Sequence, residues 1–197
     1  YNNTTWTNNT TLGYYTDVST TNLNNARALG YFASVNASNK VQVGNSSVTV
    51  IGGQVGWCTF SDGRFKKNIK QNVPGLEFIN KLNPVTYTLE IKKFDQFLGK
   101  KDSIINSKQM QEGYAIGEKK IHTGFIAQEV EETASKIGYE FDGVNKPQNE
   151  KDNYSLVYAD FVPSLVKSVQ ELSKQNDEFK NEIAELKAMV ANLAQGK

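Results

Sequence analysis

An unbroken heptad pattern near the C-terminus constrains the fold of this chain more than any other feature. Apolar residues alternate at spacings of three and four through more than four heptads, which is typical of a coiled-coil seam. The a positions are Val162, Val169, Asn176, Ile183 and Val190, and the d positions are Leu165, Leu172, Phe179, Leu186 and Leu193. A single helix would leave this apolar ridge in water, so the sequence predicts an oligomer.

The number of chains in the oligomer follows less directly from the seam. β-Branched residues at a, Leu at d and one buried Asn176 favour two strands on general rules. Phe179 at d and the flanking apolar residues Val166 and Met189 widen the seam beyond a minimal dimer. We therefore expect a homotrimer, with a two-stranded coil as the alternative.

The composition of the chain changes abruptly near residue 60. Residues 1–60 hold only three charged side chains, Asp17, Arg27 and Lys40, together with ten Asn and ten Thr. The other 40 charges lie in residues 61–197, and the whole chain has a formal net charge of +1. Because the charges balance, no global field attracts nucleic acid or a membrane surface, and we expect neither as a partner.

Cysteine content and hydropathy exclude several further classes of protein. Cys58 is the only cysteine, which rules out an internal disulfide and a cysteine-based zinc site. We expect no metal and no cofactor. No run of about 18 apolar residues occurs, so we expect no insertion into a membrane. The chain begins in mid-pattern at Tyr1, as a fragment of a longer protein would.

A short repeat occupies the uncharged N-terminal segment. Apolar residues followed by glycine recur along it, and Gly13, Gly30, Gly44 and Gly52 fall 17, 14 and 8 residues apart. Each unit reads as a short strand, a close-packed glycine and an Asn/Ser/Thr-rich turn, which is typical of a β-solenoid or β-roll. One rung has too few apolar residues to offset its ordering entropy, so neighbouring rungs or other chains must complete the core. A disordered linker is the alternative.

This repeat resembles the head repeats of trimeric autotransporter adhesins and of phage-like tail fibres. The resemblance covers roughly residues 9–53 and includes the strand expected at 49–53 before Gly52. It implies that three chains form one β-roll or interlocked prism.

The middle of the chain mixes short amphipathic pieces. We expect a helix at 73–83, a strand at 85–91, a long loop or hairpin insertion at 95–120, and a strand entering a helix at 122–138. Lys100 and Lys101 read as solvated loop charges. The predicted fold is thus a mixed, multi-part trimer. It has β-solenoid or β-roll repeats at 1–57, an α+β domain at 58–160, and a C-terminal coiled-coil helix at 161–197.

Four blocks of the C-terminal part resemble one known family. They are SDGRFKKNI from Ser61, LEFINKLNPVTYTL from Leu76, HTGFIAQEVE from His122, and YSLVYADFVPSLVKSVQEL from Tyr154. In this order they resemble the self-cleaving intramolecular chaperone domain of phage endosialidases and tail spikes, also found in the myelin regulatory factor. The resemblance covers about residues 59–185. It implies a chaperone that trimerises, guides folding of the fibre domain before it, and is released by autoproteolysis.

The same resemblance implies a Ser-Lys dyad in an S-D-x-x-x-K pattern. Ser61 would be the nucleophile and Lys66 its general base, with cleavage between Phe60 and Ser61. A serine needs a neighbouring base to take its proton, and a lysine serves as that base only as the neutral amine. Cationic neighbours such as Arg64 disfavour the ammonium form of Lys66 because like charges repel.

Geometry adds a condition to the dyad. Five residues span about 17 Å when extended, and on a helix they point about 140° apart. Neither form brings Ser61 to Lys66. A turn at Asp62-Gly63, which is a strong turn dipeptide, would do so. The alternative is a lysine from a neighbouring chain, which would make cleavage depend on assembly.

Other candidate site residues are weaker. His122 is the only histidine, and it reads either as a catalytic partner or as a core or supporting group. Gln128 and Glu129 begin a predicted helix, whose backbone N–H groups could hold an oxyanion. The alternative is that this stretch only packs the core.

The sequence leaves open whether this copy cleaves. As a single-turnover serine autopeptidase, the chain would act only on itself. The competing reading is a structural trimeric tail-fibre or adhesin tip that stays uncut and binds a receptor or glycan on a host cell. Both readings place the protein in a virion tail fibre or on a bacterial cell surface. A membrane-tethered regulator would need a DNA-binding segment and a transmembrane helix, which this chain lacks.

Overall fold

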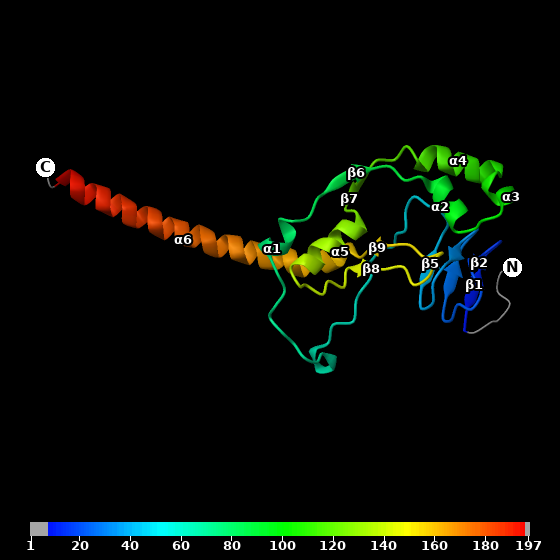
Figure 1. Cartoon of the computed structure of the whole chain (residues 1–197), viewed down its shortest axis with the longest axis horizontal. Helices are drawn as coiled ribbons and strands as arrows, with labels where there is room; N and C mark the ends of the chain where they lie inside the picture. The colour runs from blue at the N-terminus through cyan, green and yellow to red at the C-terminus, as the bar shows by residue number, and fades with distance from the viewer. Residues whose placement is uncertain (1–7, 196–197) are drawn as a thin grey trace. The chain divides into compact units, whose positions relative to one another are not determined.

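The computed structural model describes residues 8–195, which fold into two compact units (Figure 1). The first unit comprises the residues up to Ser61 together with 84–124 and 145–155. The second comprises residues 62–83, 125–144 and those from 156 onward. The chain is a mixed α+β protein with a long C-terminal helix, as expected. Only the first unit combines residues from both sides of the change in composition near residue 60.

Two parallel sheets form the N-terminal part of the first unit. The strands β1 (Thr10–Leu12), β3 (Arg27–Leu29) and β5 (Val41–Val43) make one sheet, and β2 (Asp17–Val18) and β4 (Ser34–Val35) make the other. Thr10 pairs with Arg27, and Arg27 pairs with Val41. These partners are 17 and 14 residues apart, which are the spacings predicted from the glycines. The strands therefore stack as successive copies of one repeat.

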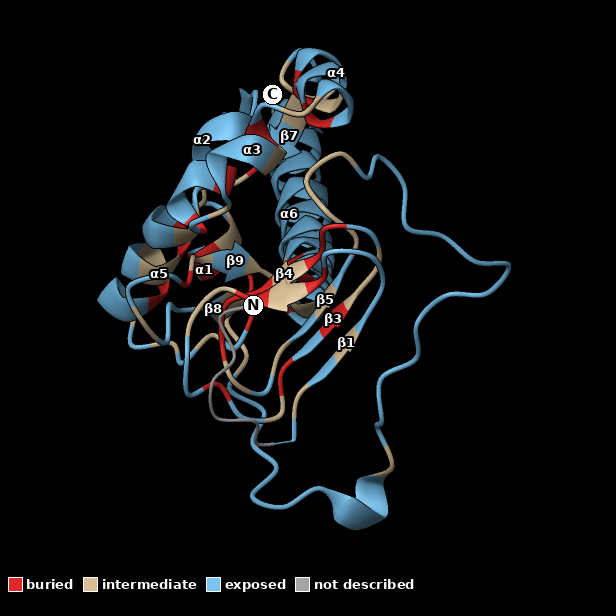
Figure 2. Ribbon diagram, turned by 90° about the vertical axis from the view of Figure 1, so that its right-hand side faces the viewer, coloured by how far each residue is buried: buried red, intermediate tan, exposed pale blue. Residues whose placement is uncertain are grey.

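Small residues let the repeat units approach closely. The core between the strands is made of buried apolar residues that are mostly small: Val18, Leu23, Ala26, Ala28, Ala33 and Val35. Gly13 has a φ of +138°, and a Cβ there would lie 2.6 Å from the carbonyl oxygen of Gly30. Only glycine fits such an approach of backbone to backbone. The buried stretches of β3 and β4 are marked in Figure 2.

The fourth repeat strand, predicted at residues 49–53, is absent. The chain from β5 to β6 (Val85–Tyr87) contains no strand, and Val50 and Ile51 are 79% and 60% exposed. A strand is stable only where a neighbour pairs with its backbone and covers one face, and a single chain supplies no such neighbour here. The prediction at 49–53 was therefore wrong for the isolated chain.

Three short helices replace the loop predicted at residues 95–120. They are α2 (Ile91–Phe97), α3 (Asp102–Ile105) and α4 (Lys108–Gly117), and the antiparallel strands β6 and β7 (His122–Gly124) flank them. Each helix buries only one or two side chains, such as Ile105 on α3 and Met110 and Tyr114 on α4. So brief an apolar period does not stand out from a polar, glycine-containing sequence. The predicted strand at 85–91 likewise ends early, at Tyr87.

The second unit is built around an aromatic core. The helices α1 (Leu76–Ile79) and α5 (Ala127–Lys136) and the 3₁₀ helix η2 (Tyr158–Phe161) supply its buried residues Phe78, Val130, Ala134 and Phe161. The strands β8 (Val144–Asn145) and β9 (Ser155–Leu156) pair with each other. The helix predicted within 122–138 is confirmed as α5. It ends as predicted near Gly138, whose φ of +66° suits a helix terminus.

The long helix α6 (Val162–Gln195) is continuous over 34 residues, or about 51 Å at 1.5 Å per residue. Its first turns pack against α1 through the buried Ser164 and Ser168. The Leu76 backbone N–H donates to Glu171 Oε2 at 2.8 Å, and a Cβ on Gly75 would lie 2.5 Å from the same oxygen. This face of α6 therefore fits its own chain closely.

The ten predicted seam residues all lie on α6 and all are exposed in the single chain. Phe179, for example, is 59% exposed and Val169 is 66% exposed. The face of α6 that packs on α1 uses other positions, so the seam is left available to another copy. Self-association through the seam stays a prediction.

Candidate functional site

The predicted cleavage segment lies in a long exposed stretch of chain. Every residue from 49 to 72 except Asp62 is exposed, as Figure 2 shows. A single 3₁₀ turn, η1 (Gly63–Phe65), interrupts this stretch. Asp62 caps the turn by accepting a hydrogen bond from the Arg64 backbone N–H at 2.9 Å, and the Lys66 N–H donates to the Gly63 carbonyl at 3.2 Å. The turn predicted at Asp62-Gly63 is confirmed.

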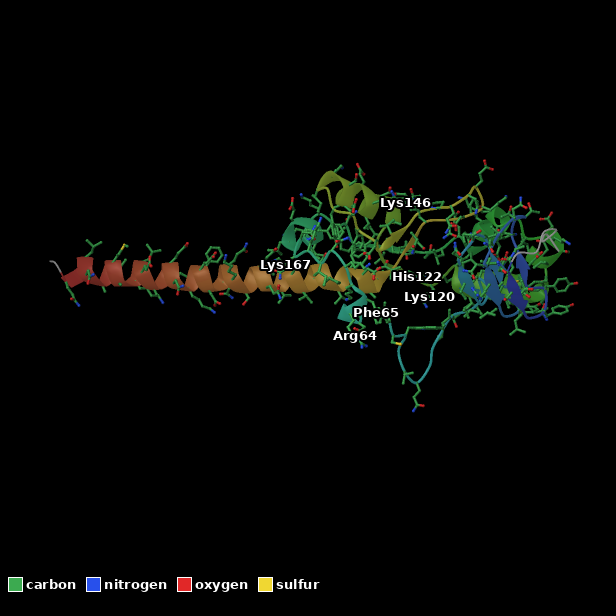
Figure 3. The ribbon with its side chains drawn as sticks, turned by 90° about the horizontal axis from the view of Figure 1, so that it is seen from below. Arg64, Phe65, Lys120, His122, Lys146 and Lys167 are labelled. Carbon is green, nitrogen blue, oxygen red and sulfur yellow. The ribbon has the colours of Figure 1, made fainter. Side chains whose placement is uncertain are left out.

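Arg64 and Asp62 also form an ion pair across the turn. Arg64 Nη2 lies 2.6 Å from Asp62 Oδ2, and this hydrogen-bonded pair lowers the pKa of Asp62 and raises the pKa of Arg64. The guanidinium also lies 5.6 Å from the centre of the Phe65 ring (Figure 3). Because Asp62 balances its charge, Arg64 disfavours the Lys66 ammonium less than the sequence suggested.

The two members of the predicted dyad flank this turn. Ser61 is the last residue of the first unit, and Lys66 belongs to the second, so neither unit by itself contains both. Both side chains are exposed, as is Phe60 at 75%. The bond between Phe60 and Ser61 is thus accessible, and the dyad itself stays a prediction.

The other predicted site residues lie elsewhere. His122 is in β7 opposite Tyr87 of β6, and the two rings stack with centroids 5.6 Å apart. Gln128 and Glu129 are in the first turn of α5, in the second unit. His122 therefore has a packing role in the first unit, in keeping with the alternative drawn from the sequence.

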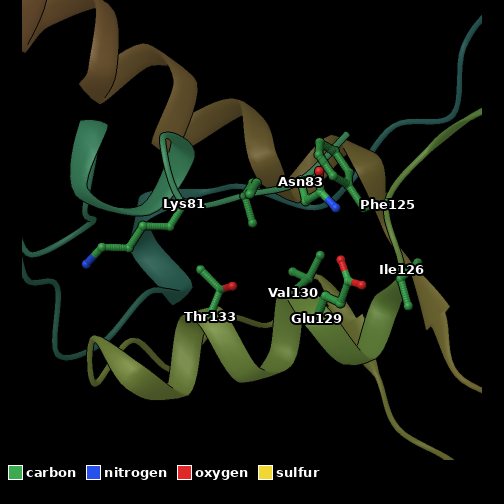
Figure 4. Close-up of a pocket in the computed structure, with 8 residues that line it drawn as sticks. Lys81, Asn83, Phe125, Ile126, Glu129, Val130 and Thr133 are labelled. Atoms are coloured by element: carbon green, nitrogen blue, oxygen red, sulfur yellow. The ribbon is translucent and has the colours of Figure 1, made fainter. Parts of the chain in front are cut away.

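Glu129 lines a small hollow in the second unit (Figure 4). The hollow lies between α5 and the turn after α1, and its lining residues are Lys81, Leu82, Asn83, Phe125, Ile126, Glu129, Val130 and Thr133. Gln128 does not line it. In the described residues, 8–195, no cluster of three or more His, Cys, Asp or Glu side chains could hold a metal ion.

A second feature, which the sequence did not predict, is a contact surface inside the first unit. We call it the docking surface, defined as residues 84–124 and 145–155 where they contact residues 8–48. Phe32, in the turn after β3, is 7% exposed and packs with Ile91, Ile105, Met110 and Tyr114. A side chain of the repeat thus completes the core of the helical segment.

Buried polar groups reinforce the docking surface. The fully buried Asp95 carboxylate accepts hydrogen bonds from Ser46 Oγ at 2.6 Å and Tyr114 Oη at 2.7 Å, and it pairs with Lys100 Nζ at 2.7 Å. Burial and the adjacent Asp95 carboxylate raise the pKa of Tyr114, so its hydroxyl keeps the proton that it donates. Lys100 was predicted as a solvated charge, but its side chain is only 8% exposed. A sequence does not reveal such pairs, because the partners meet only in the folded chain.

The segment 145–155 holds the repeat through a second polar network. Lys40 Nζ lies 3.0 Å from Asp152 Oδ1, and it also donates to Asn36 Oδ1 at 2.8 Å. The Asn36 amide donates to the Lys151 carbonyl at 2.8 Å and to Asn153 Oδ1 at 3.1 Å. The side chain of Asn36 is therefore satisfied from both segments, as a buried amide requires.

This network predicts a loss of stability in acid. Burial alone would raise the pKa of Asp152, but hydrogen bonds from Gln148, Lys40 and Asn153 outweigh burial and hold this pKa below its ordinary value of 3.8. A carboxyl whose pKa is lowered by folding stabilises the folded state above 3.8, and this contribution is lost as the pH falls through the folded pKa.

We therefore expect Asp152→Asn to lower the free energy of unfolding at neutral pH, and the difference from wild type to shrink below pH 3.8. Urea unfolding at neutral and at acid pH measures both values. The exposed Asp142→Asn serves as the matched control and should change neither. A difference that stays constant with pH would contradict this account of Asp152.

The fold and site define a mixed α+β chain in which a parallel-stranded repeat packs on the segment that follows it. Residues 61–139 match the family described as chaperone of endosialidase, and this part of the chain is a domain of that family. The match begins at Ser61, the predicted nucleophile, and covers less than half of the chain. No curated protein and no solved structure matches the chain. No helix within residues 8–195 is long and apolar enough to cross a membrane.

Proposed function

We propose that residues 61–197 act as an intramolecular chaperone for the repeat that precedes them, in a phage tail fibre or a related surface fibre. Three chains associate through the seam of α6, and the docking surface of each chain holds its repeat in register. Ser61 then cuts the chain at Phe60. Membership of residues 61–139 in a chaperone family supports the chaperone role.

One observation carries the proposal: residues 8–61 form a single compact unit with parts of the chaperone segment. A repeat needs a cap on its last rung, because that rung otherwise exposes its core and its backbone groups. Phe32 and Ser46 are buried or hydrogen-bonded only through residues 91–114. The chaperone segment thus provides the surroundings in which the last rungs are stable.

Trimerisation would raise the rate of assembly of the fibre. Bringing three separate chains together carries a large entropic cost, and the seam lowers it by raising the effective concentration of each repeat for the others. The exposed apolar residues of the repeat, such as Leu12 at 69% and Val41 at 55%, suit a surface that other chains cover. The parallel strands at offsets of 17 and 14 residues support a β-roll or β-solenoid built from these repeats.

The cleavage step needs only water as a co-reactant. The Lys66 amine takes the proton of Ser61 Oγ, and Oγ adds to the Phe60 carbonyl carbon. The bond between that carbon and the Ser61 nitrogen breaks, and the nitrogen leaves as a protonated amine. Water then hydrolyses the ester, giving a carboxylate at Phe60 and a free N-terminus at Ser61.

Mass spectrometry of freshly expressed protein tests the cleavage. We expect two species, residues 1–60 and residues 61–197, whose masses together exceed that of the 21.9 kDa chain by one water. A single species at the intact mass would exclude cleavage and would leave the uncut structural fibre tip as the better reading.

A further inference from the structure

The proposed cut does not coincide with the division of the folded chain. It separates residue 60 from residue 61, whereas the first unit contains residues 8–61, 84–124 and 145–155. Cutting one exposed bond therefore leaves the two parts of this unit packed on each other. Whether they separate depends on the docking surface and not on the bond.

The apolar part of the docking surface resists separation. The Phe32 ring lies in a cluster with Ile91, Ile105, Met110 and Tyr114, all of which are at most 9% exposed. Withdrawing Phe32 would expose this ring and open a cavity in the helical segment. Both consequences are unfavourable in water.

The polar part resists separation for a different reason. Asp95 and Asp152 lie on one side of the surface and are 0% and 6% exposed, and Ser46 and Lys40 reach them from the other side. Removing one partner of a buried charged group leaves that group without compensation. The α4 backbone also lies close to the repeat, because a Cβ added to Gly113 would lie 2.1 Å from Ser47 Oγ.

We infer that the C-terminal fragment stays docked on the repeat after cleavage, as a non-covalent cap, and that the cut alone does not release it. This inference rests on the proposed function only in taking the repeat as the fibre segment. The docking surface recognises the last rungs of a parallel β repeat, through a pocket for one aromatic ring and carboxylates for Ser and Lys. Release then requires a second event that disrupts this surface.

The test separates docking from self-cleavage by cutting the chain artificially. A recognition sequence for a specific protease is inserted in full-length Ser61→Ala between Gly56 and Trp57, where the chain is exposed and a Cβ on Gly56 would contact nothing within 4 Å. After digestion, a denaturing gel confirms two fragments, and gel filtration at neutral pH reports whether they remain together. We expect co-elution. Separate elution would overturn the inference, whether or not the wild-type chain cleaves itself.

Substitutions at the surface identify what holds the fragments. Gly113→Ala places a methyl group against Ser47, and we expect the cut fragments to separate. Adding Ser47→Gly removes the clashing atoms, and co-elution should return. Asp142→Asn, an exposed site in the other unit, should leave co-elution unchanged. Co-elution of the Gly113→Ala fragments would show that another surface holds them, which would overturn the assignment.

Discussion

Ser61→Ala leaves the chain as one 21.9 kDa band on a denaturing gel, whereas the wild-type chain gives two bands. The substitution removes the only oxygen that the mechanism uses as a nucleophile. Losing such a group lowers the rate of a nucleophilic reaction by roughly 10⁴- to 10⁶-fold. At that rate no fragment accumulates during expression and purification.

The base is tested next to the nucleophile. Lys66→Ala should block cleavage as Ser61→Ala does, whereas Lys67→Ala, at the exposed neighbouring position, should leave it unchanged. Ser135→Ala, on the exposed face of α5, is the control for the serine. If the Ser61→Ala chain still gives two fragments, another residue or a contaminating protease makes the cut, and the role of Ser61 is wrong.

Phe179→Asp abolishes the oligomer. In a three-stranded seam, this change places three carboxylates at one d layer, where each would be buried without a partner. We expect the molar mass in solution to fall from that of three chains to that of one. Light scattering coupled to gel filtration measures it directly.

A substitution on the opposite face of the same helical turn controls for charge. Asn181 is exposed on α6 and lies outside the seam, so Asn181→Asp should leave the mass of three chains unchanged. A wild-type mass of two chains would favour the two-stranded alternative, which the β-branched a positions and Asn176 suggest. A wild-type chain that is monomeric at all concentrations would contradict the proposed assembly.

The parts of the fold that the sequence predicted well carry long or repeated signals. The helix α6 follows from ten regularly spaced positions, and the offsets of β1, β3 and β5 follow from the spacing of Gly13, Gly30 and Gly44. These signals are local or periodic, so they survive without knowledge of tertiary contacts. The capped turn at Asp62 belongs to the same class, because its hydrogen bonds join residues close in sequence.

The parts that could not be predicted depend on contacts between distant segments. The helices α2, α3 and α4 are stabilised by a core that needs Phe32, some 60 residues earlier in the chain. Asp95 and Lys100 look like surface charges until Ser46 and Tyr114 are placed beside them. The strand expected at 49–53 failed for the converse reason, since no partner for it exists in one chain.

Refolding tests the central claim, that residues 61–197 fold the repeat, most directly. The full-length Ser61→Ala chain and a fragment of residues 1–60 are denatured in guanidinium and diluted under the same conditions. Circular dichroism follows the recovery of β structure, and gel filtration follows assembly. We predict that the full chain recovers β structure and oligomer, whereas residues 1–60 alone stay unfolded or aggregate. Recovery of the fragment at the same rate and yield as the full chain would contradict the claim.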